Sequence, residues 1–177
     1  MISVLRLGHR ISRDTRITTH CALVARAFGA DEIILSGEKD SGVIKSVDGI
    51  TLRWGGEFTA RYEKNWKKVL KEWKKKGGKI VHLTMYGLRV QDEIAEVREQ
   101  AKKAGLLVVI GAEKVPAEVY ELADWNIGVT NQPHSEVAAL GVFLHMLQKG
   151  EELEKKFPGA EIKVEPSARR KTIKEIS

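Results

Sequence analysis

The run LLVVIG, residues 106–111, is almost wholly apolar, and it is the segment that decides the fold class. A strand in the middle of a parallel sheet has helices packed on both faces, so side chains of both orientations are apolar. Strand-like and helix-like segments alternate on either side of this run, which is the pattern of βαβ units. We therefore predict an α/β domain with a mainly parallel sheet and helices on both faces.

The rest of the chain supplies the other elements of this sheet. Short apolar or β-branched runs predict strands at 2–7, 31–35, 79–84 and 125–129. Apolar spacings of three and four, together with glycine and proline positions, predict helices at 16–30, 62–76, 90–105 and 116–122, and another after Ser135. Asp48-Gly49 lies between two β-rich runs, which predicts a β-hairpin over 43–54.

Length and composition set further bounds. The 177 residues fit one domain over 1–150, followed by a charged extension over 151–177 that forms a hairpin or an extended arm. No apolar run approaches the length of a membrane span. The N-terminus begins in a strand-like segment, without a charged-then-apolar leader. We expect a cytoplasmic protein with no membrane partner.

Charge and cysteine content point to the class of partner. The formal net charge of +6 admits a polyanion such as nucleic acid. Lysines gather in 64–79 and arginines near the C-terminus, although a solvated helix face explains the lysine run equally well. The single cysteine, Cys21, excludes an internal disulfide and fits a small buried side chain. No cysteine and histidine spacing suits zinc, so we predict no metal site.

Three loops are the candidates for a ligand site, because ligands of parallel sheets bind beyond the carboxyl ends of the strands. They are HLTMYG (82–87), IGAEKVP (110–116) and GVTNQPHS (128–135). Each contains a glycine, and the last two lead into helix N-termini, whose free amides hold electronegative atoms. Glycine and proline residues that serve an ordinary turn would explain any one of these loops by itself. Three loops at one sheet edge favour a site.

Common nucleotide and hydrolase motifs are absent. There is no G-x-G-x-x-G after the first strand, no G-x-x-x-x-G-K-[ST] and no G-x-S-x-G, which argues against a nucleotide-dependent oxidoreductase, an ATPase or a serine hydrolase. The loop GHRISRDTR (8–16) instead carries Arg10, Arg13 and Arg16 before a helix, with Asp14 or Thr15 as its N-cap. Arginines there favour an anionic partner such as phosphate.

These loops resemble the motifs of one enzyme superfamily. IGAEKVP and IGVTNQPHSEVAALGVFLHML resemble the second and third motifs of the SPOUT (trefoil-knot) RNA methyltransferases, and RDTRITTHCALVARAFGADEIILSG resembles the first. The combination of RLGHR-x-x-RD-x-R-x-TTH, HLTMYG and GVTNQPHSE is most similar to the archaeal tRNA (cytidine-56-2′-O)-methyltransferases. The similarity covers roughly residues 1–150.

The resemblance implies a C-terminal trefoil knot that binds S-adenosylmethionine between three loops, in a homodimer that acts on tRNA. Small residues of the last helix, Ala138, Ala139 and Gly141, would let a helix of a second subunit come close. The implied cofactor-binding residues are Leu83, Thr84, Gly111, Ala112, Glu113, Lys114, Val115, Ile127, Gly128, Val129, Thr130, Asn131, Gln132, Pro133, His134, Ser135 and Val137.

The catalytic assignment departs from the superfamily pattern. Counting back from Gly29, the first-motif arginine of the 2′-O-methylating relatives falls on Leu23, and the related asparagine falls on Ile17. Arg16 is the nearest substitute to orient the attacking ribose, with Arg13 assisting. Arginine stays protonated, so neither is assigned as the general base. The expected tRNA contacts are Arg10, Arg13, Lys67, Lys71, Lys74, Arg169 and Arg170.

The alternative is a protein with the same fold that binds RNA but catalyses no reaction. The missing first-motif arginine favours a non-catalytic RNA-binding or ribosome-assembly factor, whereas the intact cofactor loops argue against it.

Overall fold

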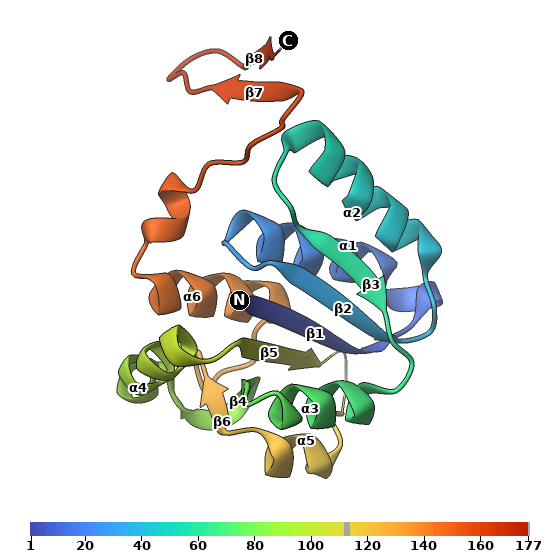
Figure 1. Cartoon of the computed structure of the whole chain (residues 1–177), viewed down its shortest axis with the longest axis vertical. Coiled ribbons are helices and arrows are strands. Elements are labelled where there is room, and N and C mark those ends of the chain that lie inside the picture. Colours follow the sequence, from blue (N-terminus) through green and yellow to red (C-terminus); the bar gives the residue numbers. More distant parts are fainter. Residues whose placement is uncertain (112–113, 177) are drawn as a thin grey trace.

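The sheet of the computed structural model, which describes residues 1–111 and 114–176, is six-stranded and parallel throughout (Figure 1). Its strand order is β3-β2-β1-β5-β4-β6. The bounds are β1 Ile2–His9, β2 Glu32–Gly37, β3 Thr59–Tyr62, β4 Lys79–Arg89, β5 Leu106–Gly111 and β6 Trp125–Gly128. The predicted fold class is confirmed, and LLVVIG lies between β1 and β4.

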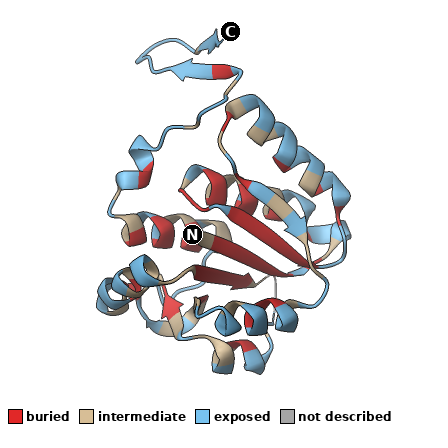
Figure 2. Cartoon of the chain, viewed as in Figure 1, coloured by how far each residue is buried: buried red, intermediate tan, exposed pale blue. Residues whose placement is uncertain are grey.

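Two hydrophobic layers cover the sheet. The larger packs α1 (Ile11–Ala27), α2 (Ser41–Trp54), α4 (Val90–Lys103) and α6 (Glu136–Gln148) on one face. The other face carries α3 (Trp66–Lys75) and α5 (Ala117–Leu122). The buried residues follow the central strands in Figure 2, where β1, β2 and β5 are buried over most of their length. Burial on both faces explains why these strands are continuous apolar runs.

The hairpin predicted over 43–54 is wrong, because this segment is the helix α2. Val43 and Val47, four residues apart, are buried on the sheet side of the helix. The Asp40 side chain caps it by accepting hydrogen bonds from the backbone N–H groups of Gly42 at 2.9 Å and Val43 at 3.1 Å. Asp48-Gly49 lies on the exposed side of α2. Packing and capping therefore override a local turn preference.

Two predicted helix starts also need correction. The helix predicted from 62 begins at Trp66, where Asn65 accepts a hydrogen bond from Lys68 N, and Tyr62 belongs to β3, a strand that the sequence did not reveal. The helix predicted from 16 begins at Ile11. The strand β3 is short and its side chains alternate between exposed and half-buried, so its local pattern is weak.

The C-terminal segment projects from the sheet as an antiparallel hairpin of β7 (Ile162–Glu165) and β8 (Thr172–Glu175), after a short 3-10 helix, η1 (Glu151–Glu154) (Figure 1). Phe157 packs under the Arg26 guanidinium at 4.7 Å, and Glu161 N donates to Arg53 O. The segment is thus tied to α1 and α2. Its division from the rest as a unit over 151–177 stays a prediction, as does the knot.

Candidate cofactor and RNA site

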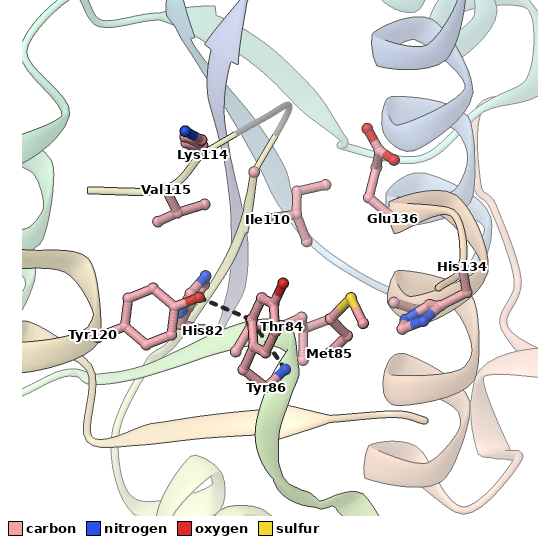
Figure 3. Close-up of a pocket in the computed structure, with 13 residues that line it drawn as sticks. His82, Thr84, Met85, Tyr86, Ile110, Lys114, Val115, Tyr120, His134 and Glu136 are labelled. Carbon is pink, nitrogen blue, oxygen red and sulfur yellow. Dashed lines mark hydrogen bonds between the residues drawn. The ribbon is translucent and has the colours of Figure 1, made fainter. Parts of the chain in front are cut away.

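A cavity of about 570 Å³ lies between residues 82–86 of β4, the carboxyl end of β5 and the loop that joins β6 to α6 (Figure 3). The connections after β4 and β6 lead to helices on one face of the sheet and that after β5 to the other face, so the loops diverge here and leave a crevice. Six of the residues predicted to bind a cofactor line it, namely Leu83, Thr84, Gly111, Lys114, Val115 and His134.

The other predicted cofactor residues have different positions. Ala112 and Glu113 lie outside the described residues. Within the described part of the chain, the cavity wall does not include Ile127, Gly128, Val129, Thr130, Asn131, Gln132, Pro133, Ser135 or Val137. The wall also includes His82, Met85, Tyr86 and Ile110, which belong to the predicted loops but were not among the predicted cofactor-binding residues, and Tyr120, Glu136 and Ala139, which lie outside those loops. Glu136 directly follows the last of the three loops along the chain.

Thr84, Met85 and Tyr86 form the mouth of the cavity, and together with Gly87 they leave the strand pairing. Leu83 and Leu88 both pair with Ile127 of β6, so the residues between them are displaced outward. A Cβ atom on Gly87 would lie 2.5 Å from the Asn126 backbone oxygen. Only glycine permits this close approach of β4 to β6, which answers why HLTMYG contains a glycine.

The polar loop 128–135 braces this mouth. The Asn131 side-chain Nδ2 donates hydrogen bonds to the carbonyls of Met85 at 2.7 Å and Gly87 at 3.1 Å. Ser135 caps α6 by accepting from Val137 N at 3.2 Å. A Cβ on Gly128 would approach Asn131 Nδ2 to 2.8 Å. The polar side chains of Asn131 and Ser135 therefore hold the backbone in place, whereas His134 lines the cavity.

His82 forms a polar part of the wall. Its Nδ1 lies 2.9 Å from Asn126 Oδ1, while Asn126 Nδ2 donates to the Tyr120 carbonyl at 3.0 Å. Asn126 thus offers an oxygen to His82, which assigns the proton to Nδ1 and leaves Nε2 as an acceptor. Among the described residues Nε2 is buried without a hydrogen-bond partner. The Tyr120 hydroxyl lies 3.0 Å from Thr84 Oγ1, as drawn in Figure 3.

His82 makes the stability depend on pH. Burial lowers the pKa of His82 below its ordinary value of 6.5, and the Asn126 hydrogen bond offsets this only in part. The unfolded chain therefore binds more protons below pH 6.5, and the free energy of unfolding falls there by at most about 1.4 kcal/mol per pH unit. We expect His82→Gln to lose less stability than the wild type between pH 7 and 5.5 in thermal melts.

An exposed histidine provides the control for this prediction. His20→Gln, on the surface of α1, is expected to keep the wild-type dependence on pH. Equal slopes for the wild type and His82→Gln would contradict the assignment of a buried neutral imidazole.

A buried ion pair reaches the same cavity. Arg6 of β1 is fully buried, and its Nη2 donates to Glu136 Oε1 at 2.8 Å. Glu136 is the first residue of α6, lines the cavity and has a side chain 25% exposed (Figure 3). A lone arginine within a strand covered on both faces needs a counter-ion. Its presence in an otherwise apolar strand was the sequence signal from which a buried ion pair could have been predicted. The pair fixes the start of α6 against the middle of the sheet.

The three N-terminal arginines do not line this cavity in the described chain. Arg10 is the N-cap residue of α1, and its Nε donates to Asp14 Oδ2 at 2.9 Å. That hydrogen bond is the main reason the pKa of Asp14 is low. Arg13 and Arg16 are exposed in the first two turns. The predicted N-cap roles of Asp14 and Thr15 are therefore wrong, since the helix begins earlier.

Apart from Arg10 and Arg13 at the start of α1, the predicted RNA contacts form two separate groups. Lys67, Lys71 and Lys74 are exposed on α3, where Lys67 Nζ pairs with Glu118 at 2.5 Å. Arg169 and Arg170 are exposed in the turn between β7 and β8. Figure 1 places α3 and this hairpin at opposite ends of the molecule, so the structure does not bring the two groups together.

The remaining predictions concern α6, Cys21, metals and membranes. Gly141 of α6 faces Val24 of α1 in the same chain, and Ala139 is buried, so these small residues already have a neighbour without a second subunit.

Cys21 is buried as predicted, and burial raises the pKa of its thiol to about 12. Within residues 1–111 and 114–176, no histidine, cysteine and carboxylate group could hold a metal, and no helix could cross a membrane.

Sequence comparisons give the family. A family model described as tRNA ribose 2′-O-methyltransferase, aTrm56, matches residues 54–174. A tRNA (cytidine(56)-2′-O)-methyltransferase of Methanothermobacter thermautotrophicus is 53% identical over 175 residues, covering 99% of this chain and 97% of that protein. The protein of the same name from Thermococcus kodakarensis is 54% identical over 177 residues, covering 99% and 98%.

Solved structures support the fold at much lower identity. The crystal structure of the A. aeolicus TrmH/SpoU tRNA modifying enzyme has a TM-score of 0.59 at 17% identity, covering 86% of this chain and 76% of that chain. The SpoU methyltransferase AviRb from Streptomyces viridochromogenes, in complex with AdoMet, has a TM-score of 0.60 at 14% identity, covering 85% and 57%. The chain therefore belongs to the tRNA ribose 2′-O-methyltransferase family aTrm56, on the SPOUT fold of the SpoU and TrmH enzymes.

Proposed function

We propose that this protein transfers a methyl group from S-adenosylmethionine to the ribose 2′-hydroxyl of cytidine 56 in the TΨC loop of tRNA, in the cytoplasm. The observation that carries this proposal is the cavity at the ends of β4, β5 and β6, which residues from all three predicted cofactor loops line. Its size is within the range of small-molecule sites. The names of the relatives supply the nucleotide.

The cavity has the chemistry to hold this cofactor. S-adenosylmethionine carries hydroxyl and amino donors, and the buried His82 Nε2, which has no hydrogen-bond partner among the described residues, supplies an acceptor in the wall. Glu136, whose Oε1 is paired with Arg6, contributes its other carboxylate oxygen as an acceptor, and Leu83, Val115 and Ile110 supply apolar contacts. We assign the contacts of the cofactor to these residues and to the predicted loop backbone, including 112–113.

The bound cofactor supplies an activated methyl group on a sulfonium. In the transfer, the ribose oxygen would form the new O–CH3 bond as the S–CH3 bond broke with its electron pair left on sulfur, and the hydroxyl proton would pass to a base or to water. Holding the reacting atoms in line supplies much of the rate in such a transfer. Arg16 is assigned to orient the ribose and its phosphate, assisted by Arg13.

The position of Arg16 gives this proposal a requirement for two subunits. Arg16 is exposed on α1 and is not part of the described wall of the cavity in the chain that carries it. We propose that the protein is a homodimer in which Arg16 of one subunit faces the cavity of the other. Exposed apolar side chains favour α1 and α6 as the helices that contact the second subunit. Ile11 of α1 is 51% exposed and Val142 of α6 is 45% exposed.

A methyl-transfer assay tests the function directly. Radiolabelled S-adenosylmethionine is incubated with the protein and unmodified tRNA, and the modified nucleotide is identified after digestion. We expect 2′-O-methylcytidine at position 56. Tight cofactor binding without transfer would contradict the activity and favour a non-catalytic RNA-binding factor, and methylation of another nucleotide would contradict the target.

A further inference from the structure

A second cavity, of about 480 Å³, lies on the other side of the β5–α5 connection from the cofactor cavity. Lys114 and Val115 line both cavities and so form a shared wall. The remaining wall comes from the ends of β1 and β2 and from the segment before α3, with Gly8, His9, Glu38, Lys64 and Trp66 among its residues. Segments far apart in the sequence therefore meet next to the reaction site.

The topology explains why a cavity forms here. The connection after β1 leads to α1 on one face of the sheet, whereas that after β5 leads to α5 on the opposite face. Since β1 and β5 are adjacent and parallel, the two connections separate at their carboxyl ends. Such switch points are where α/β sheets bind ligands, and β5 has one on each side.

The floor of this second cavity is held rigidly. His9 at the end of β1 is buried, with its Nδ1 2.9 Å from Thr18 Oγ1 and its Nε2 3.3 Å from Asp40 Oδ2. Asp40 also accepts from Thr15 Oγ1 at 2.8 Å and caps α2. One carboxylate thus joins the end of β1 to two helices, which preorganises the cavity for a ligand.

The lining matches a nucleotide. Trp66 is half-buried and offers an aromatic ring for stacking, and Lys67 Nζ lies 5.4 Å from the centroid of that ring. Lys64 and Lys114 supply cations for phosphate. The Glu38 carboxylate is held in position by accepting a hydrogen bond from Ile11 N at 2.7 Å. A carboxylate accepts from the 4-amino group of cytosine, whereas uracil presents a carbonyl there.

We propose that this second cavity holds the cytosine base of the nucleotide to be methylated, stacked on Trp66 and read at its amino group by Glu38. A base bound there brings its ribose to the wall formed by Lys114 and Val115, beside the cofactor cavity. This inference rests on the proposed function, because it assumes a cytidine as the target. It adds a separate binding site for the base and two residues, Trp66 and Glu38, that recognise it.

A double-mutant cycle between protein and RNA tests the stacking. The wild type and Trp66→Ala are each assayed on tRNA with cytidine 56 and on tRNA lacking only that base. On normal tRNA, Trp66→Ala is expected to lower kcat/KM roughly 5–150-fold, with the cofactor dissociation constant unchanged. On the abasic tRNA the two proteins should be nearly equal, and Trp66→Phe should restore most of the loss.

Trp73→Ala is the matched control on the same helix. Trp73 donates its Nε1–H to the Lys79 carbonyl at 3.1 Å and does not line the described wall of this cavity. Its loss should lower the melting temperature but affect both tRNAs equally. If Trp66→Ala also reduced kcat/KM by the same factor on both tRNAs, the base would not contact Trp66 and the proposal would be overturned.

Glu38→Gln tests the reading of the base. An amide both accepts and donates, so this variant should keep the hydrogen bond from Ile11 N and tolerate a uridine at position 56. The ratio of kcat/KM for C56 to that for U56 is expected to fall about tenfold or more relative to the wild type. An unchanged ratio would remove Glu38 from base recognition.

The wild-type reaction separates the two levels of inference. No methylation of C56 by the wild type would contradict the proposed function itself. Normal methylation by the wild type, with additive effects in the cycle, would contradict only the assignment of the second cavity.

Discussion

Replacing Arg16 with alanine is expected to lower methyl transfer by about 100- to 1,000-fold, the usual effect of removing one positioned donor from a reaction centre. Arg16 is exposed and does not line the cofactor cavity of its own chain. Because Arg16 is assigned to the ribose and its phosphate and not to the cofactor, the cofactor dissociation constant should stay within about twofold of the wild-type value. Single-turnover methylation of unmodified tRNA and equilibrium cofactor binding measure the two quantities separately.

Arg53→Ala serves as a charge-matched control, because Arg53 is an exposed arginine in the last turn of another helix, α2. It should leave methyl transfer nearly unchanged. The assignment of Arg16 fails if cofactor affinity falls in parallel with transfer. Mixed dimers that combine an Arg16→Ala subunit with a subunit disabled in its cofactor cavity should recover part of the activity, since each pair would retain one complete site.

Replacing Arg6 with methionine is expected to destabilise the fold by about 3 kcal/mol, the lower end of the cost of breaking a buried ion pair. The lower end applies because the Glu136 side chain is 25% exposed and can regain some hydration. Methionine fills much of the volume of the arginine side chain, so little of the lost stability comes from a cavity. Most of it comes from the Glu136 carboxylate that has lost its partner. For a chain of this length, the melting temperature should fall by roughly 6–12 °C.

A second substitution identifies the cause of that loss. Arg6→Met combined with Glu136→Gln should be more stable than Arg6→Met alone, because the unpaired carboxylate is gone. Arg53→Met, on the surface, should stay within about 0.5 kcal/mol of the wild type. Unchanged stability of Arg6→Met in chemical denaturation would contradict the role of this pair in fixing α6.

Local pattern was sufficient to locate the three candidate loops but not their internal arrangement. The strands 79–84, 106–111 and 125–129 were correctly located, and their carboxyl ends meet at one edge because parallel strands must align their ends. The sequence did not separate the residues that line the cavity from those that brace it. Asn131 illustrates this, because its side chain holds the carbonyls of Met85 and Gly87, more than forty residues away.

The sequence by itself determined the α/β class, the central strands and the three loops, because each depends on side-chain periodicity and turn chemistry within a few residues. Tertiary structure alone decided that 43–54 is a helix, since burial of Val43 and Val47 and capping by Asp40 outweigh the turn preference of Asp48-Gly49. It also decided which strands are neighbours. The Arg6–Glu136 pair, 130 positions apart, and the second cavity both follow from that order, because non-local contacts depend on how the apolar faces pack and leave no local pattern in the chain.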